Sequence, residues 1–137
     1  MSASPEREAT QYGPSIRQFE ELDVDPDTFG HDAHLYVAWT YLADLDLLAA
    51  IDRYRSTLRR LTIKLGVPGK YHETITWLYM IAVAERRRQR PADDWPAFKA
   101  ANADLFAAGG AFVRRYYRPA TLESETARQQ FILPDAQ

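Results

Sequence analysis

The chain has 137 residues, of which 46% are hydrophobic and 26% charged, with a formal net charge of −2 at pH 7. This length suits a single domain, and the absence of cysteine excludes disulfides, thiolate metal sites and cysteine nucleophiles. No secretory signal pattern follows the start and no apolar run is long enough to span a bilayer, so we expect a cytoplasmic protein with no membrane partner.

The charges are unevenly distributed along the chain. Residues 1–50 hold ten acidic and two basic residues, whereas residues 51–118 hold fourteen basic and six acidic ones. Such asymmetry is typical of a surface for nucleic acid or an acidic substrate, or of an acidic first segment that docks on a basic middle. We favour the second interpretation, because the slightly negative net charge gives no overall attraction to polyanions.

Residues 1–28 are expected to form an extended acidic leader. Prolines and a glycine interrupt them, and residues 20–27 are too acidic for a core. Within this leader, Ser15 could cap a short helical turn. The helical domain is expected to comprise residues 29–137.

Three longer helices are predicted by the spacing of apolar residues, over about residues 30–45, 47–65 and 71–88. Asp46 is placed to cap the second helix, and a Gly-Val-Pro-Gly sequence at residues 66–69 ends it. The third helix is apolar on several sides, which predicts a central position among its neighbours.

Shorter helical segments follow Pro91. One is predicted from the cap and first turn at residues 93–96 to about residue 101. Another short stretch follows residues 102–104, is interrupted at Gly109-Gly110 and continues over 111–117, and a last segment covers about residues 119–130. No alternating pattern of strand length occurs. The predicted fold is therefore all-α, a single-domain bundle of four to six helices.

The three histidines are the main functional signal. His31 and His34 share a face at the start of the first long helix, and His72 lies at the start of the third. In an up-down bundle these two helices run parallel, with their N-termini at one end, so the imidazoles can converge. A helix N-terminus favours the neutral ring, which is the form that binds metals, and three histidines leave a coordination position open for chemistry.

This pattern predicts a mononuclear three-histidine site for a divalent transition metal (zinc, iron or copper), with Glu73 as catalytic acid or base. The alternative is structural: His34 hydrogen-bonded within the core and His31 exposed at a helix start. A histidine pair at this spacing is weak evidence for a metal site by itself, and the metal-binding sequence His-Glu-x-x-His is not present.

Four residues near His72 are candidates for binding a small-molecule substrate: Lys70, Tyr71, Thr76 and Tyr79. Lys70 and the arginines of the basic middle favour an acidic molecule. A lysine at this position is also common as a solvated residue at a helix start.

The histidine segments also resemble a known group of proteins. Phe29-Gly30-His31-Asp32-Ala33-His34-Leu35, residues 37–42 (VAWTYL) and residues 69–76 (GKYHETIT) look like a functionally unassigned family of small helical bacterial proteins. The resemblance covers about residues 28–133. It implies that the two histidine segments form one feature, and it implies no particular reaction.

A non-catalytic helical adaptor is the alternative function. Its basic face, which includes residues 86–90 and 114–118, would bind a protein or nucleic-acid partner. Nucleic acid is the weaker choice, because cations at residues 86–90 complement a helix C-terminus. The many aromatic residues are compatible with a homodimer.

Overall fold

The computed structural model describes residues 10–136, which form eight α-helices and no β-strand. The all-α prediction is therefore confirmed, although the helices outnumber the four to six expected because several are single turns. The α-helices are α1 (Ile16–Glu20), α2 (His31–Asp44), α3 (Leu47–Lys64), α4 (Glu73–Gln89), α5 (Trp95–Ala101), α6 (Ala111–Arg114), α7 (Pro119–Glu123) and α8 (Glu125–Gln129). Short 3-10 turns are η2 (Pro68–Lys70), η3 (Ala103–Phe106) and η4 (Ala108–Gly110).

The long helices begin and end close to where the sequence predicts. The Asp46 carboxylate accepts a hydrogen bond from the Ala49 amide at 2.8 Å, which caps α3. After α3, Gly66 adopts a φ of +75°, a left-handed conformation that glycine takes without steric cost.

The later helices are shorter than predicted. The segment expected over residues 119–130 is divided at Ser124, whose hydroxyl accepts a hydrogen bond from the Ala127 amide at 3.1 Å. A serine side chain that bonds the backbone in this way starts a new helix and ends the previous one. Similarly, α6 ends at Arg114, before the predicted end at residue 117.

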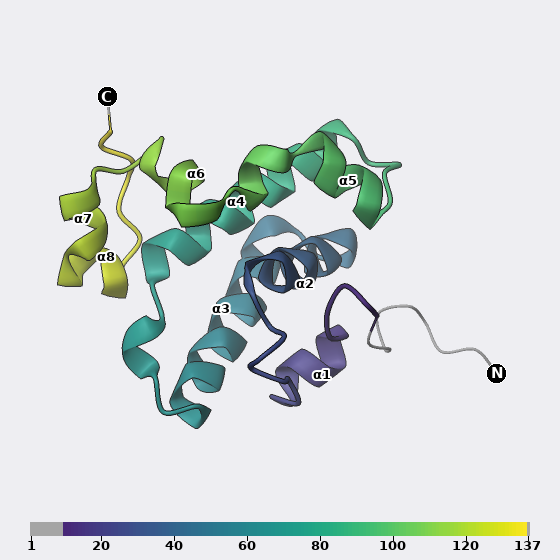
Figure 1. Cartoon of the computed structure of the whole chain (residues 1–137), viewed down its shortest axis with the longest axis horizontal. Coiled ribbons are helices and arrows are strands. Elements are labelled where there is room, and N and C mark those ends of the chain that lie inside the picture. The colour runs from purple at the N-terminus through teal and green to yellow at the C-terminus, as the bar shows by residue number, and fades with distance from the viewer. Residues whose placement is uncertain (1–9, 137) are drawn as a thin grey trace.

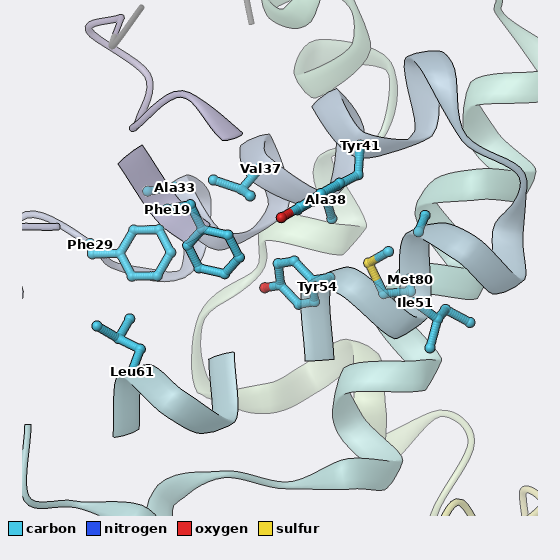
Figure 2. Close-up of a cluster of buried hydrophobic side chains, with 11 residues drawn as sticks. Phe19, Phe29, Ala33, Val37, Ala38, Tyr41, Ile51, Tyr54, Leu61 and Met80 are labelled. Atoms are coloured by element: carbon cyan, nitrogen blue, oxygen red, sulfur yellow. The ribbon is translucent and has the colours of Figure 1, made fainter. Parts of the chain in front are cut away.

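The segment expected to be an extended leader is partly packed into the domain. Phe19 of α1 is fully buried, and its ring lies between Phe29 and Tyr54, with centroid distances of 5.7 and 5.5 Å (Figure 2). The helical turn that Ser15 could cap is present, and the extended leader is not confirmed for α1, because this single side chain ties the turn to the core. Residues 1–9 of the expected leader lie outside the described part of the chain.

Part of the acidic first segment docks on the basic middle, as predicted. Glu20 accepts two hydrogen bonds of 2.8 Å from the guanidinium of Arg53 on α3. Lys64, at the end of the same helix, donates to the carbonyl of Leu22 at 3.0 Å. These contacts hold α1 and the following loop against α3.

Two hydrophobic clusters form the interior, and α2 and α4 contribute to both. The first joins α1, α2, α3 and Met80 of α4, and the second joins the other face of α2 to α4, α5 and α6. Figure 1 shows α2 between α1 on one side and α5 and α6 on the other. The predicted central position of the 71–88 helix agrees with its buried residues on several sides.

Helices α2 and α4 run parallel. The ring of His31 lies 4.9 Å from that of Tyr79, and Arg87 donates to the carbonyl of Trp39 at 3.2 Å. Both contacts join residues 48 positions apart, so the two helices advance together in the same direction. This is the relation that the up-down order predicts.

Within residues 10–136, no helix combines the length and the apolar character that crossing a membrane requires.

Candidate functional site

A cavity of about 550 Å³ lies between α2, α3, the loop that contains η2, and the first half of α4. Several side chains labelled in Figure 2 also form its wall: Phe29, Ala38, Tyr54, Leu61 and Met80. The cavity is thus continuous with the first hydrophobic cluster. All three histidines lie on its wall, together with Lys70, Tyr71, Thr76 and Tyr79.

His34 is held by its own helix start. Its Nδ1 lies 2.6 Å from the Gly30 carbonyl, and because a carbonyl can only accept, Nδ1 carries the proton. The ring also packs on Phe29, with a centroid distance of 4.2 Å. Burial lowers the pKa of His34, which outweighs the carbonyl contact. His34 is therefore neutral at pH 7, and its Nε2 has no hydrogen-bond partner among the described residues.

His31 is anchored to a distant turn. Its Nε2 donates to the Leu105 carbonyl at 2.8 Å, and the His31 and Tyr79 rings pack in a T-shaped arrangement. Its Nδ1 is left without a partner in the described part of the chain. His31 therefore resembles His34 in having one ring nitrogen that no described residue contacts through a hydrogen bond.

His72 uses both ring nitrogens within the protein. As the N-cap of α4, its Nδ1 accepts a hydrogen bond from the Ile75 amide at 3.2 Å. Its Nε2 donates to the Leu122 carbonyl at 2.7 Å. Burial lowers the pKa of this histidine, and the nearby Arg128 charge acts in the same direction. A neutral His72 therefore fastens α7 to the start of α4.

The parallel register explains why the three imidazoles share a cavity but do not meet. His31 lies level with Tyr79, which is seven residues after His72 and so about 10 Å further along the helix axis. Between residues 10 and 136, no three His, Asp or Glu side chains form a group that could hold a metal ion. The three-histidine metal site stays a prediction, which this arrangement does not favour.

Glu73 lies beside the cavity and is not part of its wall. Its carboxylate accepts hydrogen bonds from Arg55 at 2.9 Å, from the Trp77 indole at 3.1 Å and from the Tyr71 hydroxyl. A nearly buried carboxylate is stable when it is paired and fully hydrogen-bonded in this way. The contacts describe a structural ion pair between α3 and α4, and a catalytic role for Glu73 stays a prediction.

The four predicted substrate-binding residues differ in whether their polar groups are free to contact a ligand. Thr76 donates to the His72 carbonyl at 2.8 Å and Tyr71 donates to Glu73, so both hydroxyl protons are already used. The Lys70 ammonium and the Tyr79 hydroxyl make no hydrogen bond or ion pair with any described residue. These last two groups can therefore contact a ligand.

Several cations of the basic runs that suggested an adaptor surface have partners within the protein. Arg86 and Arg115 both pair with Asp104, each at 2.8 Å. Arg87 lies over the Trp39 ring, with its guanidinium carbon 4.1 Å from the ring centroid. These cations help to hold α2, α4 and η3 together.

The apolar wall of the cavity is what the sequence reasoning missed. Leu58 and Leu61 of α3 and its C-cap residue Leu65 belong to one apolar stripe, which is the usual signal for a core-facing side. Nothing in that spacing separates a side chain that meets a neighbouring helix from one that faces a cavity.

Comparison with models of protein families, with curated proteins and with solved structures finds no match to this chain.

Proposed function

We propose that this protein binds a small, largely apolar organic molecule in the cavity between α2, α3 and α4. The observation that carries this proposal is the cavity itself, with its volume of about 550 Å³ and its apolar wall. Small-molecule sites typically have volumes of roughly 300–1,000 Å³, apolar linings and a few polar groups that orient the ligand.

The polar groups on the cavity wall include both a hydrogen-bond acceptor and a hydrogen-bond donor. His34 offers an unprotonated Nε2 and can accept a hydrogen bond, whereas the Tyr79 hydroxyl can donate one. His34 is fixed by Gly30 and Phe29, so its acceptor needs little ordering when a ligand binds. These features support binding of a molecule that has an apolar body and at least one polar group.

Blocking the cavity tests the proposal. The neutral aromatic probe N-phenyl-1-naphthylamine, which fluoresces in apolar surroundings, is titrated into the native protein and into Leu58→Trp. Leu58 lines the cavity, so a larger side chain there occupies the ligand's space. We expect saturable binding to the native protein and a loss of roughly tenfold or more in affinity for Leu58→Trp.

Two further variants make the result specific. Leu48→Trp adds the same ring on the same helix at a position that is 70% exposed and outside the cavity, and should bind the probe normally. Leu65→Trp, at a more exposed wall position, replaces Leu58→Trp if that variant does not fold. Absence of saturable binding to the native protein, or equal binding by all variants, would overturn the proposal.

Metal binding is a second candidate, because His31 and His34 each keep one free ring nitrogen on the cavity wall. Two imidazoles would need further ligands from water or from the bound molecule. Metal content measured by mass spectrometry on protein purified without chelators tests this, with His34→Ala as the comparison. Near-stoichiometric metal in the native protein alone supports a metal site, and no metal after reconstitution with zinc, iron or copper contradicts it.

A further inference from the structure

We propose that the cavity selects an apolar monoanion, such as an aromatic carboxylate or sulfonate, whose charge lies against the ammonium of Lys70. This inference rests on the small-molecule binding proposed above and names the class of ligand for the same cavity.

The charge of the cavity wall carries the argument. Of the described residues that line the cavity, Lys70 is the one with a permanent charge, and none carries a carboxylate. Burial holds the pKa values of two wall histidines, His34 and His72, below the ordinary range, so these two add no competing positive charge at pH 7. A ligand in this cavity therefore meets one permanent cation and no carboxylate.

Lys70 also lacks an internal partner. The lysines elsewhere in the domain are engaged: Lys64 donates to the Leu22 carbonyl at 3.0 Å, and Lys99 pairs with Asp32 at 2.5 Å. No ion pair or hydrogen bond of the Lys70 ammonium occurs within residues 10–136. An ammonium at the edge of an apolar cavity, without a carboxylate of its own, favours binding of an anion.

Neighbouring cations strengthen the positive potential around Lys70. The Arg128 guanidinium donates to the carbonyl of Gly69 at 2.6 Å, and Arg59 lies over the Tyr71 ring, 5.7 Å from its centroid. Both flank the loop that contains Lys70. Arg59 is exposed and Arg128 is half-buried, so solvent partly screens these charges and they add modestly to the potential at Lys70.

The acidic groups nearest the cavity do not cancel that potential, and Glu125, which lines a neighbouring hollow with Arg59 and Arg128, is exposed to solvent. Glu73 is paired with Arg55 at 2.9 Å, so its charge is compensated. Asp25 and Asp27 flank Pro26 at the cavity, but both are exposed, and the Asp25 carboxylate accepts the Asp27 amide hydrogen at 2.9 Å. Solvent screens these two carboxylates from the interior.

Two probes with the same aromatic body separate charge recognition from apolar binding. 8-Anilinonaphthalene-1-sulfonate is an anion, and N-phenyl-1-naphthylamine is its neutral counterpart. Both are titrated into the native protein, Lys70→Met and Lys70→Arg. We expect Lys70→Met to weaken sulfonate binding roughly two- to fivefold, the range for a partly exposed ion pair. Binding of the neutral probe should not change, and Lys70→Arg should restore sulfonate binding.

Arg88→Met is the matched control, because it removes one charge from an exposed residue of α4 outside the cavity. Equal affinities of native protein and Lys70→Met for the sulfonate, or an equal loss for Arg88→Met, would overturn the inference. If the neutral probe binds and the sulfonate does not, the inference fails and the proposed function stands. If neither probe binds the native protein, both fail. Thermal melts confirm that each variant is folded, since loosened proteins also bind the sulfonate.

Discussion

At the scale of single residues, the histidines show how far side-chain chemistry can be predicted from a sequence. Their positions at helix starts follow from the sequence. The lowered pKa values of His34 and His72 come from burial, and the partners of His31 and His72 are carbonyls 74 and 50 residues away. Such long-range partners decide which ring nitrogen stays free, and no local pattern encodes them.

The lowered histidine pKa values predict that acid destabilises the protein. His72 and His34 titrate below the ordinary value of 6.5 when folded, so between that value and the folded pKa the unfolded chain binds more protons. Their contribution to stability is therefore complete above about pH 6.5 and is lost as the pH falls. Urea unfolding at pH 7.5, 6.5 and 5.5 should show a decreasing free energy of unfolding.

His72→Asn isolates one part of this pH dependence. The asparagine oxygen can accept the Ile75 amide hydrogen at every pH, so the capping contact no longer titrates. We expect a shallower decrease in stability between pH 7.5 and 5.5 than in the native protein. An unchanged slope would show that the His72 cap is not responsible.

Glu73→Gln tests the structural interpretation of the buried carboxylate. Removing its charge weakens the contact with Arg55, and hydrogen bonds to charged groups contribute about 2 kcal/mol each. We expect a loss of that size in the free energy of unfolding, with unchanged affinity for N-phenyl-1-naphthylamine. Glu85→Gln, on the exposed side of α4, is the control, and equal stability of the two variants would contradict the interpretation.

At the scale of elements, the predictable parts of the fold are those that local chemistry determines. Asp46 caps α3 and the glycine at residue 66 ends it, and both signals involve neighbours in the sequence. The exception is α1, whose acidic surroundings suggested a leader. Its place in the domain depends on Phe19 reaching Phe29 and Tyr54, contacts that the composition does not reveal.

Phe19→Ala tests whether α1 belongs to the folded unit. Replacing a fully buried phenylalanine by alanine removes apolar contact and leaves a cavity, at a cost of about 3–5 kcal/mol. Arg17→Ala changes an exposed side chain of the same turn and should have little effect. Calorimetry or urea unfolding measures both, and a Phe19→Ala variant as stable as Arg17→Ala would show that α1 is not anchored.

At the scale of the whole molecule, the candidate site arises from the parallel register of α2 and α4 with α3 alongside. The sequence indicated which segments belong together, and all three histidines do line one cavity. The sequence could not indicate the cavity, because an unfilled volume depends on how three helices and a loop pack together. An apolar stripe on a helix has the same spacing whether it packs against a neighbouring helix or lines a cavity.

The central claim is that this cavity receives an apolar ligand, and nuclear magnetic resonance tests it most directly. Uniformly ¹⁵N-labelled protein is titrated with N-phenyl-1-naphthylamine, and amide shifts are followed residue by residue. We predict that the largest shifts cluster around the cavity wall, at Ala38, Leu61 and Met80. Shifts centred instead on Phe98 and Val113 of the second hydrophobic cluster, or spread evenly over the chain, would contradict the account.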